Sequence, residues 1–133
     1  MNRLMPILFF LFVLSSCDPG HVVILSNQSL EDKNIKVIVT DKHKIHYLDS
    51  IAIIDSVNAL GRLMIAISKD SNANSYSFTL EKRKNAVLQQ GIGGPDLTEK
   101  IIVDFTDTIS LIKDKRITTK KEGISTAMTV RLE

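Results

Sequence analysis

Apolar and polar residues alternate with a period of two in short runs along most of this chain, which limits it to folds built from β-strands. Between positions 75 and 81, for example, Tyr76, Phe78 and Leu80 fall on one face of an extended chain, and the residues between them are all polar. An amphipathic helix would instead repeat its apolar positions every three or four residues. We therefore predict half-buried strands of an antiparallel sheet.

Similar runs, bounded by residues that favour turns, occur from one end of the chain to the other. The predicted strands are Val22–Ser26, Asn34–Thr40, His43–Ile54 with a break near Asp49, Arg62–Ser68, Ser75–Glu81, Ala86–Gln90, Lys100–Phe105, Thr108–Lys113, Arg116–Lys120 and Thr126–Glu133. Positions 48–60 also fit helical spacing. Because Ile51, Ile53 and Val57 alternate as well, we interpret this segment as a strand followed by a loop.

Roughly seven to nine short strands in about 100 residues is the size of an immunoglobulin-like sandwich, and the chain resembles that family in architecture only. It has no Trp and only one Cys, so it lacks the residues of a standard antibody domain. We predict an all-β, antiparallel two-sheet sandwich over residues 22–133, with a small β-barrel as the alternative.

The first seventeen residues follow a different pattern. Arg3 precedes an apolar stretch, and the unbroken apolar run from Ile7 to Leu14 is only eight residues long. A membrane-spanning helix needs about 20 such residues. This segment is therefore predicted to be a cleaved signal helix rather than a permanent membrane anchor.

The segment ends in Leu14-Ser15-Ser16-Cys17, which resembles the lipobox of bacterial lipoprotein precursors. The resemblance covers only the front of the chain. It implies that residues 1–16 are a signal peptide, that a signal peptidase cuts between Ser16 and Cys17, and that Cys17 carries a diacylglyceryl group, with or without an N-acyl chain. Residues 17–21 would then be the acylated N-terminus and a short tether.

Lipidation of Cys17 would explain how an exported protein carries a single Cys, since an unpaired thiol is a liability in an oxidising compartment. Two or three acyl chains suffice for stable anchoring at a bilayer. Because the tether is short, the domain is expected close to the lipid, on the periplasmic or cell-surface side. Asp18 resembles an inner-membrane retention signal of enteric bacteria, but other groups sort differently, so inner and outer membrane both stay open.

Charge and aromatic content argue against nucleic acid as a partner. The whole chain has a formal charge of +2, and loss of Arg3 with the signal peptide leaves 16 Lys and Arg against 15 Asp and Glu. The mature chain keeps four aromatic residues, Tyr47, Tyr76, Phe78 and Phe105. So few aromatics make a base-stacking or sugar-stacking platform improbable.

Two segments contain residues that often bind metal ions or phosphate groups. His43 and His46, near Asp41 and Asp49, suggest a metal site, but residues three apart on a strand point to opposite faces. Residues 91–95 are glycine-rich, but β-strand sequence follows them rather than the helix that a phosphate-binding loop needs. We therefore predict no metal or cofactor site.

Catalytic candidates are equally weak. There is no Gly-x-Ser-x-Gly motif, the single Cys is assigned to the anchor, and Asp104 and Asp107 look like ordinary surface acids. Two basic clusters, Lys82-Arg83-Lys84 and the group Lys113, Lys115, Arg116, Lys120 and Lys121, are interpreted as solvated surface. Near a membrane they would still help to orient the domain.

These observations predict a non-catalytic, lipid-anchored envelope protein that acts as a binding or assembly module. It would contact another envelope protein through loops or a sheet edge, which requires an exposed apolar patch or an unpaired strand. The alternatives are a carrier of a small hydrophobic ligand or lipid, which requires an internal cavity, and a hydrolase, which requires a pocket of perturbed acids or histidines.

Overall fold

A computed structural model describes residues 20–40, 45, 48–55, 62–70, 72–92, 98–123 and 125–133. The predicted signal peptide, the cleavage position at Ser16 and the lipidation site Cys17 lie outside the described residues. Within them, no helix is long and apolar enough to cross a membrane.

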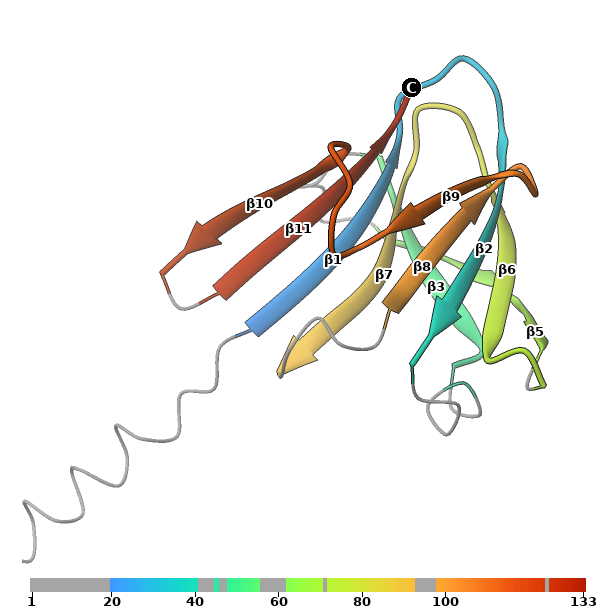
Figure 1. The fold of residues 1–133 in the computed structure, drawn as a ribbon, viewed down its shortest axis with the longest axis horizontal. Coiled ribbons are helices and arrows are strands. Elements are labelled where there is room, and N and C mark those ends of the chain that lie inside the picture. The colour runs from blue at the N-terminus through green and yellow to red at the C-terminus, as the bar shows by residue number, and fades with distance from the viewer. Residues whose placement is uncertain are drawn as a thin grey trace, which may run out of the picture.

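The described residues form eleven β-strands in two sheets (Figure 1). The strands are β1 (Gly20–Asn27), β2 (Lys33–Val39), β3 (Ser50–Ile54), β4 (Leu63–Ala66), β5 (Ser68–Asp70), β6 (Ser75–Leu80), β7 (Asn85–Ile92), β8 (Thr98–Val103), β9 (Asp107–Ser110), β10 (Ile117–Glu122) and β11 (Ser125–Leu132). One sheet has the order β10-β11-β1-β7-β3-β4 and the other β5-β6-β2-β8-β9. This is a β-sandwich without barrel closure, so the predicted all-β class and two-sheet architecture are confirmed.

The prediction of a fully antiparallel arrangement is wrong at one strand pair. The first and last strands, β1 and β11, run parallel, with His21 opposite Thr126 and Asn27 opposite Leu132. Parallel neighbours require a long connection between them, and here nearly the whole domain provides it. All the other strand pairs of the described residues are antiparallel.

The core lies between the sheets and contains the apolar residues that the alternation selected. Ile35, Val37 and Val39 of β2 are buried, and so are Tyr76, Phe78 and Leu80 of β6. From the six-stranded sheet, Val23, Leu25, Ile51, Ala86, Leu88, Val130 and Leu132 join the same cluster. Apolar burial of this kind is the main stabilising contribution in a small domain.

Some details differ from the sequence-based prediction. The predicted strand Arg62–Ser68 is divided at Ile67 into β4 and β5, which belong to different sheets. The chain turns this corner with the Ile67 N–H donating to the Asp49 carbonyl oxygen at 3.3 Å. Ser75, expected to face solvent, is buried between its pairing partners Asp70 and Ile38.

Another predicted strand ends earlier than expected, and one prediction is confirmed. The predicted strand Lys100–Phe105 ends at Val103, and Phe105 lies in the turn that follows. At positions 48–60, strand β3 confirms the predicted strand, and residues 56–60 lie outside the described residues.

Candidate functional site

The most exposed apolar element of the described structure is β4, the edge strand of the six-stranded sheet. Its sequence is Leu63-Met64-Ile65-Ala66, and Leu63 and Met64 are 66% and 57% exposed. Among the described strands only β3 pairs with it. Edge strands are normally protected by charged side chains, proline or a bulge, because an open edge pairs readily with another chain. No residue of β4 is charged or a proline, so the strand has neither of these two protections, and its short length of four residues is the one that it retains.

A groove of about 400 Å³ lies beside β4. Half-buried Ile53 and Ile65, together with exposed Leu63, form its apolar wall, and Thr79 and Glu81 approach from the side of β6. Strand β5 pairs only with positions 75–77 of β6, so no described strand pairs with this side of Thr79. The two sheets therefore separate here after being joined at the corner between β4 and β5.

The rim of this groove is charged. The Lys84 ammonium forms an ion pair with Asp55, and the hydrogen bond and charge of Asp55 raise the pKa of Lys84. Arg62 immediately precedes β4 and also lines the groove. An extended peptide that entered the groove would therefore meet an apolar wall and a rim with both signs of charge.

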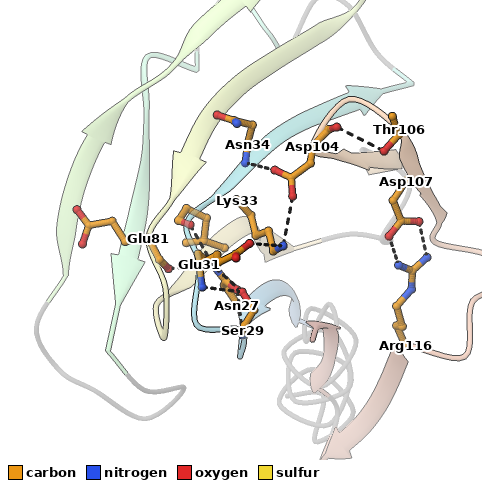
Figure 2. Close-up of polar contacts among 11 residues, drawn as sticks. Asn27, Ser29, Glu31, Lys33, Asn34, Glu81, Asp104, Thr106, Asp107 and Arg116 are labelled. Atoms are coloured by element: carbon orange, nitrogen blue, oxygen red, sulfur yellow. Dashed lines mark hydrogen bonds and ion pairs between the residues drawn. The ribbon is translucent and has the colours of Figure 1, made fainter.

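A second set of polar contacts joins the turns at the same end of the strands (Figure 2). Lys33 forms an ion pair with Asp104 at 3.3 Å, and the backbone N–H of Asn34 donates to the same carboxylate at 2.9 Å. These contacts attach the β8–β9 turn to the start of β2. Lys33 and Asp104 carry opposite charges, so this contact adds no net charge to the surface.

Asp107, like Asp104 expected from the sequence to be an ordinary surface acid, is also held by a basic residue. Asp107 accepts hydrogen bonds from Nη1 and Nη2 of Arg116, and Nε and Nη2 of the same guanidinium donate to Asp114 at 2.9 Å. These hydrogen bonds raise the pKa of Arg116 and lower the pKa of Asp114 to about 2. Asp114 is therefore ionised at neutral pH and is poorly suited to act as a general acid.

The candidate metal site and the glycine-rich segment lie largely outside the described residues. Asp41, His43 and His46 are outside the described residues, whereas Asp49 is exposed and bonded to Lys69 at 2.8 Å. Within the described residues there is no group of three or more His, Cys, Asp or Glu that could hold a metal ion. Of the glycine-rich segment, positions 91 and 92 extend β7, and 93–95 are outside the described part.

The two basic clusters are partly neutralised. Lys82 and Arg83 are exposed in the β6–β7 turn, and Lys84 is paired with Asp55. In the second cluster Arg116 is held by two carboxylates, and Lys121 is exposed at the end of β10.

Sequence reasoning did not single out β4, because an apolar run of four residues is equally consistent with a central, fully buried strand. The absence of charge within positions 63–66 was the available signal, but it becomes meaningful only once the strand is known to lie at an edge.

Comparison with protein-family models, with curated proteins and with solved structures finds no match to this chain. The fold and the site define a β-sandwich with an open apolar edge in the described part of the larger sheet.

Proposed function

We propose that this protein is a lipid-anchored bacterial envelope protein and a non-catalytic binding or assembly module, which recruits an extended segment of another envelope protein as an additional strand beside β4. The observation that carries this proposal is the exposure of the uncharged edge strand Leu63–Ala66. Strand addition of this kind obtains affinity from main-chain hydrogen bonds and specificity from pockets for alternate side chains.

The groove beside β4 provides such a pocket. Ile53 lies opposite Leu63 in the sheet, and both side chains line the groove. Alternate residues of an added strand would point toward the same side, so the partner segment is expected to carry apolar residues at every second position. The charged residues at the rim would select polar residues on either side of that apolar segment of the partner; these rim residues are Asp55, Lys84 and Arg62.

In this proposal the anchor precedes the start of β1, whereas Leu63 lies beside the far end of that strand, because Leu63 pairs with Ile53 in a row that continues through Ala86 to Leu25. Cys17 stands three positions before Gly20, where β1 begins, so an extended tether spans only about 10 Å. Lys121 lies at the same end of the sheet, because it pairs with Thr126, which pairs with His21. We propose that this end faces the lipid and that Lys121 contacts anionic headgroups.

We also propose that the two sheets of the domain have an immunoglobulin-like arrangement. It is supported by the size of the domain and by the two packed sheets of six and five strands.

Site-specific photo-crosslinking in the bacterial envelope tests the edge proposal. A photoreactive residue in place of Met64 is expected to cross-link one envelope protein, and the same residue in place of Thr119, on the opposite edge strand β10, is expected not to. Adding Leu63→Lys should abolish the Met64 cross-link, because a charged edge residue opposes strand pairing. Equal cross-linking from both positions, or a cross-link that survives Leu63→Lys, would contradict the proposal.

The anchor has its own test. The intact mass of protein purified from membranes should correspond to a chain that begins at Cys17 with added acyl groups, and the Cys17→Ser variant should lack them. A wild-type mass without lipid would remove the anchor from the proposal but leave the edge proposal standing.

A further inference from the structure

A second groove, of about 490 Å³, lies on the outer face of the five-stranded sheet. Its floor is a row of cross-strand neighbours, Ser68, Ser77, Lys36 and Ile102, contributed by β5, β6, β2 and β8 in that order. Phe105, from the β8–β9 turn, stands at its rim. The volume is within the range of small-molecule sites, which is about 300–1,000 Å³.

Lys36 is the unusual residue of this groove. It is half-buried, yet it has no ion pair or side-chain hydrogen bond with any described residue. By contrast, Lys33, Lys69 and Lys84 each bind a carboxylate. A cation that is partly removed from water and has no anionic neighbour attracts an anion more strongly than a fully solvated one.

Asp104, which precedes Phe105 in sequence, is not an anionic partner of Lys36. Asp104 is held by Lys33 and by the backbone N–H of Asn34, as Figure 2 shows, and it is not among the residues that line the groove. Ser77 is the cross-strand neighbour of Lys36, and Ser68 follows Ser77 in the same row. Both residues are exposed, and their hydroxyl groups have no partner among the described residues. The floor thus presents one positive charge and two free hydroxyl groups.

Phe105 gives the groove an apolar side. Its side chain is 84% exposed, and its backbone is left-handed, with φ of 66° next to Asp104 at 48°. Bulky residues rarely adopt this conformation, and Asn or Gly is usual at such turn positions. The turn therefore holds a large aromatic ring in solvent at a conformational cost. Half-buried Ile102 continues the apolar surface along the floor.

We propose that this groove binds a small organic anion with an apolar body. The phosphate or carboxylate group contacts the Lys36 ammonium and the hydroxyl groups of Ser68 and Ser77, and the apolar body lies against Ile102 and Phe105. This site is separate from the β4 edge and does not depend on the partner proposed there. The same chemistry is offered by a free metabolite-sized anion and by a lipid headgroup.

Equilibrium dialysis of radiolabelled phenyl phosphate against the membrane-purified protein in nanodiscs tests the proposal, with empty nanodiscs as the blank. Wild type should bind, and Lys36→Gln should weaken binding about tenfold or more, as expected for loss of a charge-assisted contact. Phe105→Asn, which retains a residue suited to the turn, should weaken binding several-fold. Lys113→Gln, an exposed lysine outside the groove, is the matched control and should bind as wild type does.

Absence of binding to wild type, or equal binding by Lys36→Gln, would overturn the proposal. Binding of inorganic phosphate as tight as that of phenyl phosphate would overturn the apolar part of it. The lipid composition distinguishes the source of the anion. If phosphatidylglycerol discs compete with phenyl phosphate and phosphatidylcholine discs do not, the ligand is an anionic headgroup, and equal binding in both identifies a free anion.

Discussion

The side-chain amide of Asn27, at the end of β1, donates to the carbonyl oxygen of Leu80 in β6 at 3.1 Å and so joins the two sheets. The same nitrogen lies 2.9 Å from the Glu31 carbonyl oxygen and 3.2 Å from that of Glu81. The side-chain oxygen of Asn27 accepts a hydrogen bond from the Ser29 hydroxyl at 2.7 Å (Figure 2). Asn27 is only 1% exposed, so these contacts satisfy polar groups that water does not reach.

Asn27→Ala is therefore expected to destabilise the domain by about 1–3 kcal/mol, because it leaves a buried carbonyl group without a donor. Urea denaturation of the full-length protein measures this loss. Asn72→Ala, in an exposed turn, is the control and should change stability by less than about 0.5 kcal/mol. Equal effects of the two substitutions would show that Asn27 does not connect the sheets.

At the strained turn that contains Phe105, a substitution is expected to raise the stability of the domain. Phe105→Gly should stabilise the protein by roughly 0.5–1 kcal/mol, since glycine adopts a positive φ without steric cost and little apolar burial is lost. Thr106→Gly, one residue later and without a positive φ, should destabilise it instead. Thermal denaturation compares the two, and a loss of stability in Phe105→Gly would refute strain at this position.

Tyr76 is 1% exposed, and its hydroxyl has no hydrogen-bond partner among the described residues. Burial also raises the pKa of Tyr76. Tyr76→Phe removes an unsatisfied polar group and keeps the ring, which stacks on Phe78 with centroids 6.2 Å apart. We expect stability to be unchanged or slightly increased, whereas Tyr76→Ala should cost about 3–5 kcal/mol as a core deletion. A loss above about 1 kcal/mol in Tyr76→Phe would reveal a buried partner.

The pKa of Asp114 falls from 3.8 to about 2 because Arg116 donates hydrogen bonds to the ionised carboxylate. A lowered folded-state pKa means that the stabilisation is complete above the unfolded value and is lost as the pH falls toward 2. The stability difference between wild type and Asp114→Asn should therefore shrink between pH 5 and 2. It should not exceed about 1 kcal/mol at pH 7, since the pair is partly solvated. A difference independent of pH would exclude this linkage.

Local alternation predicted where most strands lie, since a half-buried strand must place its apolar residues at every second position. Val37 and Phe78 are buried as this rule requires. The rule does not say which strands become neighbours, so the parallel pairing of His21 with Thr126 could not be predicted. Nor does it show where a straight run such as Arg62–Ser68 bends at Ile67 from one sheet to the other.

The all-β class, most core residues and the predicted lipidation at Cys17 follow from local periodicity and from a short contiguous motif. The exposed edge at Leu63–Ala66 and the groove lined by Lys36 and Phe105 become visible only in the folded domain. Edges and grooves arise from pairing between strands that are distant in sequence. The same apolar or charged residue can be buried, paired or exposed according to the neighbour that it receives.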